Sequence, residues 1–303
     1  MRFRTRISNV ALLHKIVRSL AALAKVCVVR LSPDSVHFIV PGNEGRDGVQ
    51  PTLFDHYRIE SNNNNEIWLE INLDALLKVL RSADTSSGIA DGGRGGNTTL
   101  SDADVMVKLN KLDGRPVWTF EISGRTSQGH PITITHNVTV HIISSRRQKE
   151  LTEPLCPPPD IHLVLPNLSE LKTIVSRLGH LAEDVSLAAN HNGQLDLSVK
   201  ASGVQMSTTW NNLRIPTTAD AEDTEPPPPD KMFSTTISIR GFQKFLTSHY
   251  VSGVAIACEY GLSYHAEYSG ICEGHCVIAY VYIGEIDEAG GVLTFFLPAK
   301  NVD

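Results

Sequence analysis

The chain has 303 residues, of which 41% are hydrophobic, and a net charge of -6 at neutral pH. This length and composition exclude a disordered protein and are sufficient for one large or two ordinary domains. No run of 18 apolar residues occurs, and Met1–Ile7 alternates basic and apolar side chains instead of forming a signal peptide. We therefore expect a soluble intracellular protein with no membrane partner.

Most of the sequence alternates polar and apolar residues with a period of two, which is typical of half-buried strands. The strands predicted in the first half are Phe3–Ile7, Val26–Leu31, Val36–Val40, Ile67–Ile71, Val105–Leu109, Val117–Ile122 and Ile132–Ile143. Those predicted in the second half are Ile161–Leu165, Val185–Ala189, Leu195–Val199, Val204–Thr209, Ile237–Ile239, Val254–Cys258 and Val277–Ile283. Between two of these strands, Asn192-Gly193 is the strongest hairpin signal in the chain.

Four amphipathic helices are predicted, at Asn9–Lys25, Leu73–Ala83, Asn167–His180 and Ser238–Ser248. The first and third start 158 residues apart, and the second and fourth start 165 residues apart. Each half therefore contains a strand, a helix, three strands, a strand, a helix and three strands, which indicates a duplicated unit. We expect an α+β fold in which each half packs two helices on antiparallel sheets.

The two halves are predicted to be separate domains, one over residues 1–143 and one over residues 161–303. Ser144–Asp160, which contains Pro157–Pro159, is predicted to be a stiff, extended linker. Segments without a helical or strand period are predicted to be loops: Gly42–Pro51, Asn62–Asn65, Ser82–Thr99 and Ile215–Asp230.

The four helices carry nearly all of their charge as Lys and Arg. Nine cations against two acidic residues, Asp74 and Glu170, give the helices +7 and leave -13 for the rest of the chain. The nine cations are Lys15, Arg18, Lys25, Lys78, Arg81, Lys172, Arg177, Arg240 and Lys244. Cations on a helix surface usually do no more than interact with water. Their recurrence at equivalent positions of a repeat, beside small residues, instead favours contact with the phosphates of a polyanion.

The five cysteines favour buried, reduced thiols, because Cys27, Cys258 and Cys276 lie in apolar, strand-like runs. The alternative is a zinc site at Cys272-Glu-Gly-His-Cys276 with His265. No second pair of ligands has the spacing of a structural zinc site. We expect no metal and no cofactor.

An enzyme is the main alternative class of function, because the chain has 12 His and many Asp and Ser. A hydrolase needs a nucleophile, a base and an orienting acid in one pocket, and no motif of that kind is found. His136, His141 and His162 lie on predicted strands, where histidine more often has a structural role. No catalytic residues are predicted.

Five runs of residues carry a family resemblance: Met1-Arg-Phe-Arg-Thr-Arg-Ile, Leu23-Ala-Lys-Val-Cys-Val-Val-Arg-Leu-Ser-Pro-Asp, Leu165-Pro-Asn-Leu with the helix after it, Ile237-Ser-Ile-Arg-Gly-Phe-Gln-Lys-Phe-Leu and Phe295-Phe-Leu-Pro-Ala. They resemble the Hus subunit of the DNA-damage checkpoint clamp, the PCNA-like heterotrimer usually called nine-one-one. The resemblance spans nearly the whole chain apart from the predicted loops.

The resemblance implies one third of a ring that encloses double-stranded DNA, in the nucleus, with the basic helices lining the channel. Such a clamp is not an enzyme. The implied partners are two other PCNA-like, Rad-type subunits, a clamp loader, and repair and checkpoint proteins. A homotrimeric replication clamp of the PCNA type stays an alternative, since it would share the fold and the channel.

The resemblance also implies a client pocket beneath the linker, beside the C-terminal segment. The matching residues are Leu31, Val36, Leu151, Leu155, Phe295, Phe296, Leu297 and Pro298. The long, proline-rich linker differs from the hydrophobic linker of PCNA. The edge strands Ile132–Val140 and Val204–Trp210 would pair with neighbouring subunits. The interface residues are then Ile132, Ile134, His136, Val138, Val140, Val204, Met206, Thr208 and Trp210.

Overall fold

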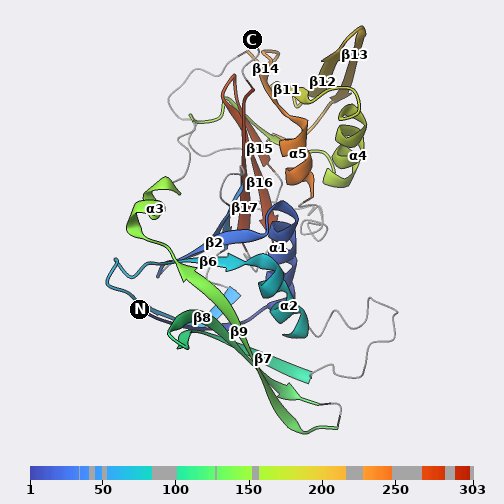
Figure 1. Cartoon of the computed structure of the whole chain (residues 1–303). Helices are drawn as coiled ribbons and strands as arrows, with labels where there is room; N and C mark the ends of the chain where they lie inside the picture. Colours follow the sequence, from blue (N-terminus) through green and yellow to red (C-terminus); the bar gives the residue numbers. More distant parts are fainter. Residues whose placement is uncertain are drawn as a thin grey trace. The chain divides into compact units, whose positions relative to one another are not determined.

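The computed structural model describes residues 1–33, 35–40, 45–49, 53–83, 101–126, 128–151, 157–215, 228–247, 268–283 and 291–300. The chain forms two compact units, one built mainly from residues 1–152 and the other mainly from residues 153–303 (Figure 1). The exact limits of the two predicted domains stay a prediction.

The first unit contains one run of antiparallel strands with two helices packed on it. In order of hydrogen bonding, the strands are β3 (Val36–Val40), β2 (Val26–Leu31), β6 (Ile67–Asn72), β9 (Pro131–Ile142), β8 (Arg115–Arg125), β7 (Ser101–Leu112), β1 (Arg2–Ile7) and β5 (Phe54–Glu60). Helices α1 (Val10–Leu23) and α2 (Leu73–Ala83) lie side by side (Figure 1).

The second unit repeats this plan with two groups of strands. One group has the order β13 (Val204–Trp210), β12 (Leu195–Ala201), β11 (Asp184–Ala189) and β14 (Phe233–Ser238). The other has the order β10 (Ile161–Val164), β15 (Tyr268–Cys272), β16 (Cys276–Ile283) and β17 (Gly291–Pro298). Helices α4 (Leu168–Leu178) and α5 (Ile239–Leu246) also lie next to each other (Figure 1).

Side-chain caps fix where the helices begin. The Asn9 side chain accepts a hydrogen bond from Leu12 N at 2.9 Å, and the Asn167 side chain accepts one from Ser169 N at 2.9 Å. Each bond satisfies a backbone donor that has no partner within the first turn. Helix α1 ends at Leu23, two residues before the predicted end at Lys25, because Ala24 is extended and the Lys25 carbonyl accepts from Leu73 N.

Turn residues connect the strands as predicted. Asn192-Gly193 joins β11 to β12, and Gly193 has a φ of +77°. A Cβ atom at Gly193 would lie 2.3 Å from the Leu213 carbonyl oxygen, so only glycine fits there. The predicted loop Asn62–Asn65 is also confirmed, since it forms the turn between β5 and β6, with Asn64 and Asn65 in the left-handed region.

Two predictions about segments without a period were wrong. Part of the linker Ser144–Asp160 is helix α3 (Ser145–Glu150), and part of the loop Gly42–Pro51 is strand β4 (Gly45–Val49), which neighbours β3. Strands β5, β15 and β17 were not predicted either. The predicted strand Val254–Cys258 and most of the loops Ser82–Thr99 and Ile215–Asp230 lie outside the described residues.

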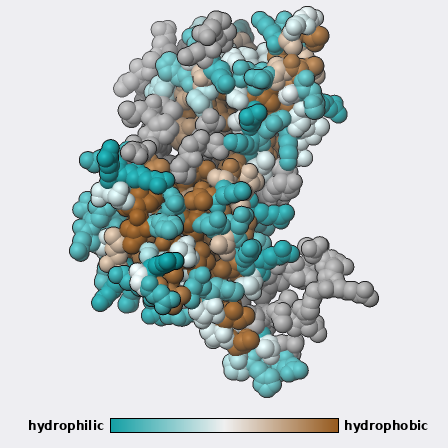
Figure 2. Space-filling model, viewed as in Figure 1, coloured by the Kyte–Doolittle hydropathy of each residue, from teal (hydrophilic) through white to brown (hydrophobic). Residues whose placement is uncertain are grey.

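Helix α3 forms because its side chains bind the first unit. Arg147 Nη2 lies 3.1 Å from Glu70 Oε2, and Gln148 Nε2 donates to the Ile143 carbonyl at 3.0 Å. Directly after the helix, Leu151 packs on a cluster formed by Val28, Ile39, Trp68 and Ile143. Figure 2 shows apolar side chains over β2 and β6, next to the hydrophilic residues of α3. The contacts of Arg147 with Glu70 and of Leu151 with Val28, Ile39 and Trp68 join residues far apart in sequence, so the local pattern does not reveal them.

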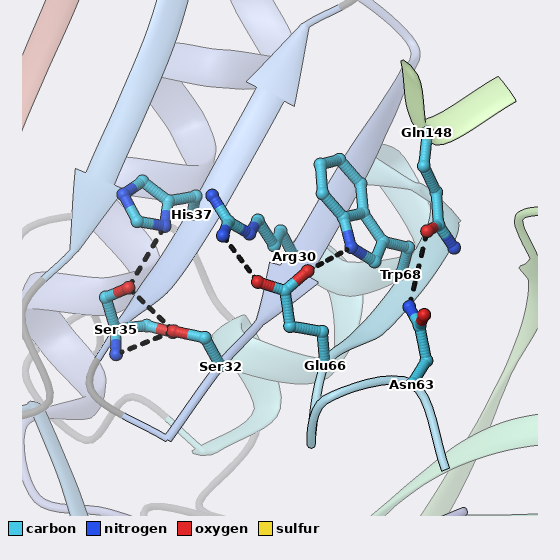
Figure 3. Close-up of polar contacts among 8 residues, drawn as sticks. All are labelled: Arg30, Ser32, Ser35, His37, Asn63, Glu66, Trp68 and Gln148. Carbon is cyan, nitrogen blue, oxygen red and sulfur yellow. Dashed lines mark hydrogen bonds and ion pairs between the residues drawn. The ribbon is translucent and has the colours of Figure 1, made fainter. Parts of the chain in front are cut away.

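A polar cluster on β2 and β6 lies next to this contact (Figure 3). Arg30 Nη2 and Glu66 Oε1 are 2.5 Å apart, Trp68 Nε1 donates to Glu66 Oε2 at 3.0 Å, and the Arg30 guanidinium lies 5.3 Å from the Trp68 ring centre. Burial works against ionisation of Glu66. The hydrogen bonds from Arg30 and Trp68 and the charge of Arg30 outweigh it, so the pKa of Glu66 is lowered.

We expect Glu66→Gln to lower the free energy of unfolding by about 1 kcal/mol at pH 7, because it removes a partly buried charged pair. A lowered pKa in the folded state means that this stabilisation is present above the ordinary value of 4.5 and is lost as the pH falls through the lowered pKa. Urea unfolding of both proteins between pH 3 and pH 7 measures the difference.

Glu60→Gln is the matched control, because Glu60 is well exposed and lies 3.8 Å from Arg2. It should change stability by less than about 0.5 kcal/mol at any of these pH values. An equal effect of the two substitutions would contradict a special role for the Glu66 cluster.

Candidate nucleic-acid interface

Helices α1 and α2 place their cations on the side that faces away from the core. Leu13, Ile16, Val17 and Leu20 of α1 are buried, and Leu73, Leu76, Val79 and Leu80 of α2 are buried. Lys15, Arg18, Lys78 and Arg81 are exposed. In each helix the two cations are three residues apart and therefore share one face. Because α1 and α2 are neighbours, these four residues form one basic surface, which we call the N-terminal basic surface.

Lys25 is exposed as well, but it lies beyond the end of α1 rather than on its face. Its carbonyl oxygen accepts the hydrogen bond from Leu73 N at the start of α2, at 2.9 Å. Its position between the two helices still places it next to the N-terminal basic surface.

Helices α4 and α5 have the same two-sided construction. Leu168, Leu171, Val175 and Leu178 of α4 are buried, as are Phe242, Phe245 and Leu246 of α5. Arg177 and Arg240 are exposed, whereas Lys172 and Lys244 are half-buried. Each unit therefore carries its predicted cations on two neighbouring helices.

Each helix pair has a side-chain hydrogen bond to a strand of its own unit. Trp210 Nε1 of β13 donates to Glu170 Oε1 at 3.4 Å, and in the first unit His136 Nε2 of β9 lies 3.0 Å from Ser82 Oγ at the end of α2. Neither contact was expected from the sequence, because the paired residues are 40 and 54 positions apart and no local pattern connects them.

Strand β9 has one open edge over most of its length. Residues Pro131–Thr139 pair with β8, but on the other side β6 pairs only with Val140–Ile142 among the described residues. Ile132 is 38% exposed and Ile134 and His136 are half-buried, whereas Val138 and Val140 point into the core. The first three side chains, and not Val138 or Val140, are available at the surface.

Strand β13 is the outer strand of its group and pairs only with β12 in the described part of the chain. Val204 and Met206 are 53% and 37% exposed, and Thr208 and Trp210 are half-buried. An open edge with exposed apolar side chains is a surface on which another strand can pair.

The predicted pocket residues lie mostly in the cores of the two units. Leu31 and Val36 are buried in the first unit. Phe295, Phe296 and Leu297 are buried in the second, where the Phe295 ring makes an edge contact with Phe245 at 5.1 Å. Pro298 is exposed, Leu151 is half-buried, and Leu155 lies outside the described residues. A client pocket at these residues stays a prediction.

The described residues contain no group of three His, Cys, Asp or Glu that could hold a metal ion. The predicted burial of Cys27 and Cys276 is confirmed. Cys272, the register partner of Cys276, is also buried. Cys258 and His265 lie outside the described residues.

Burial lowers the pKa of His162, which favours its neutral form. Among the described helices, none is long and apolar enough to cross a membrane.

Residues 1–301 match the family model described as Hus1-like protein. The chain belongs to the Hus1-like family. It is 30% identical to "Checkpoint protein hus1" of Schizosaccharomyces pombe, with 98% of each chain covered. It is 26% identical to "Checkpoint protein HUS1" of Homo sapiens, with 85% of this chain and 90% of the human protein covered.

The fold of this Hus1-like chain is similar to that of proliferating cellular nuclear antigen from Entamoeba histolytica. The TM-score is 0.65 at 16% sequence identity, and the match covers 98% of each chain. The predicted fold, a PCNA-like DNA clamp subunit of the α+β class, is therefore confirmed.

The two faces of α1 should respond differently to substitution. We expect Ile16→Ala to lower the free energy of unfolding by about 2–5 kcal/mol, because Ile16 is fully buried. Its neighbour in sequence, Lys15, is exposed, so Lys15→Glu should change stability by less than about 0.5 kcal/mol. Thermal or urea unfolding compares them, and a large loss for Lys15→Glu would show that Lys15 has a structural role.

Proposed function

We propose that this chain is one subunit of a heterotrimeric ring that encloses double-stranded DNA in the nucleus. Membership of the Hus1-like family and the PCNA-like fold make it a component of a DNA-damage checkpoint clamp. The observation that carries the DNA-binding proposal is the orientation of the helices. Their apolar sides are buried against the sheets, and the side chains exposed to solvent include two cations of each of α1 and α2 and one cation of each of α4 and α5.

Contacts of this kind would hold the phosphate backbone without reading its sequence. A ring is retained on DNA because it is closed, so each contact can be weak and the subunit can slide. Catalysis plays no part in this function. We propose that the ring instead holds repair and checkpoint proteins at the DNA and is placed there by a clamp loader.

The two open edges support a ring with two different neighbours. β9 would offer Pro131–Thr139 to one partner, and β13 would offer Val204–Trp210 to the other. In a homotrimer, β9 of one copy would have to pair with β13 of the next. In a heterotrimer, each edge selects its own partner, and we propose that these are two other PCNA-like subunits.

We expect the double substitution Lys15→Glu with Arg18→Glu to weaken binding of the assembled ring to DNA. Loss of two phosphate contacts should reduce the slope of log affinity against log salt concentration by about two, by the counterion-release relation. Fluorescence anisotropy with a labelled duplex, at several salt concentrations, measures this slope.

Lys111→Glu with Arg115→Glu is the matched control. Both residues are exposed at the hairpin between β7 and β8, away from the helices, and the change in net charge is the same. This control should leave the slope nearly unchanged. Equal losses in the two rings would mean that overall charge, and not the N-terminal basic surface, governs binding.

Substitutions at the open edges should affect one neighbour each. We expect Ile132→Lys to weaken the contact of β9 with its partner, and Val204→Lys to weaken that of β13 with the other partner, because a lysine at a strand edge opposes pairing. Pairwise pull-downs with the two partner subunits measure the two contacts separately. Leu112→Lys, at an exposed apolar position on the β7–β8 hairpin, is the control.

If Ile132→Lys and Val204→Lys each left both pairwise contacts intact, the ring proposal would fail. A stable homotrimer of this chain alone, found by native mass measurement, would favour the PCNA-type replication clamp instead.

A further inference from the structure

A hollow on the strand face of the first unit contains an unusual concentration of arginine. It has a volume of about 360 Å³ and is lined by Arg4, Thr5, Arg6, His56, Arg58 and Met106, from strands β1, β5 and β7. None of these residues belongs to the basic helices or to the open edges of β9 and β13 described above. The hollow is therefore a separate feature that the proposed clamp function does not use.

Two arginines lie directly opposite each other in this hollow. Arg4 of β1 and Arg58 of β5 are register partners, so their side chains leave the sheet on the same face. Like charges at such a position destabilise a strand pair unless an anion lies between them. The pair on one side of them has the usual arrangement, since Arg2 faces Glu60 and forms an ion pair with it at 3.8 Å.

The neighbouring cations on these strands are neutralised within the chain. Arg6 binds Asp104 through two hydrogen bonds, of which the Nη2–Oδ2 bond is 2.6 Å. This contact lowers the pKa of Asp104. Lys108, the β7 partner of Arg4, donates to Glu121 at 2.6 Å. Each of these cations therefore has a carboxylate.

Arg4 and Arg58 have no such carboxylate among the described residues. The Arg4 Nε donates to Met106 Sδ at 3.1 Å, and a thioether is a weak, uncharged acceptor. No ion pair or hydrogen bond of the Arg58 guanidinium occurs in the described part of the chain. Two positive charges thus remain side by side, with no counter-charge from the residues that the structure describes.

A bulge next to the arginine pair shapes the hollow. Between Arg4–Arg58 and Arg6–Asp55, β1 advances by two residues and β5 by three. The extra residue places His56 at a φ of +52°, in the left-handed region that non-glycine residues seldom adopt. Thr5 Oγ1 donates to the Asp55 carbonyl at 3.1 Å and holds the bulge in place. Bulges and backbone strain of this kind are frequent at binding sites.

We propose that this hollow binds the phosphate-monoester group of a phosphorylated, extended peptide. A phosphate monoester carries a charge of about -1.5 to -2 at neutral pH, which matches the two arginine charges. Two guanidinium groups can donate paired hydrogen bonds to its oxygens. Strand β5 is the last strand in the hydrogen-bonding order of the first unit, so an extended peptide has a backbone edge beside the hollow.

The surrounding charges favour one phosphate group over a nucleic-acid backbone. Glu60 lies two residues from Arg58 on β5, and Asp104 and Glu121 lie toward the other strands. Successive residues on one face of a strand are about 6.6 Å apart. The space between the Arg4–Arg58 pair and the nearest of these carboxylates is therefore roughly the size of one phosphate group. A continuous polyanion would meet these carboxylates.

The test uses the full-length chain and isothermal titration calorimetry with three probes. They are inorganic phosphate, the acetylated and amidated pentapeptide Thr-Val-phosphoserine-Val-Thr, and the same peptide without phosphate. We expect the phosphopeptide to bind at least tenfold more tightly than inorganic phosphate, and the unphosphorylated peptide not to bind. Arg58→Gln and Arg4→Gln should each weaken phosphopeptide binding at least tenfold.

Arg2→Gln is the control, because Arg2 is exposed, has Glu60 as a partner and lies outside the hollow. It should change affinity by less than twofold. Without peptide, Arg2→Gln should keep the wild-type melting temperature, and Arg4→Gln and Arg58→Gln should keep or raise it, because each removes one of two facing like charges. The proposal is overturned if the phosphopeptide does not bind, if inorganic phosphate binds as tightly as the peptide, or if Arg58→Gln has no effect. Displacement of the phosphopeptide by a 12-base-pair DNA duplex would also overturn it, by assigning the hollow to nucleic acid.

Discussion

The burial of one side of each helix against strands determines where the charged residues of this protein lie. In α1, the side chains of Leu13, Ile16, Val17 and Leu20 are withdrawn from water, and each such burial contributes about 1.5–3 kcal/mol. Lys15 and Arg18 alternate with these residues in sequence, so they must point to solvent once the apolar side is fixed. The same constraint acts on α2, α4 and α5, and it gives both units a basic surface without a separate folding requirement.

The strands follow a different rule for charge. Across neighbouring strands, cations and carboxylates are matched, as in Arg6 with Asp104, Lys108 with Glu121 and Arg30 with Glu66. In each of these pairs the carboxylate neutralises the cation, so the pairs add no net charge to the sheets. The pair Arg4 and Arg58 is an exception, because two arginines face each other there without a carboxylate from the described residues. Two residues away, Arg2 faces Glu60 in the usual arrangement.

The open edges of β9 and β13 depend on the same cores. Val138 and Val140 fix β9 by burial, which leaves the backbone of Pro131–Thr139 and the side chain of Ile132 at the surface. A monomer with two such edges exposes pairing surfaces that proteins usually cover or charge. In the proposed ring, neighbouring subunits would cover both edges and remove this hazard.

The sequence by itself determined the features that depend on local periodicity. Neighbouring residues alone decide the limits of β2, β3 and α2, the start of α4 to within one residue, the hairpin at Asn192-Gly193 and the basic side of each helix. Only the tertiary structure decided the rest. Helix α3 depends on the contacts of Arg147 with Glu70 and of Gln148 with Asn63, and β4 depends on its place next to β3. The pairing of Arg4 with Arg58 depends on a register between strands more than 50 residues apart in sequence. Such contacts leave no local pattern, since their energy comes from residues that only the fold brings together.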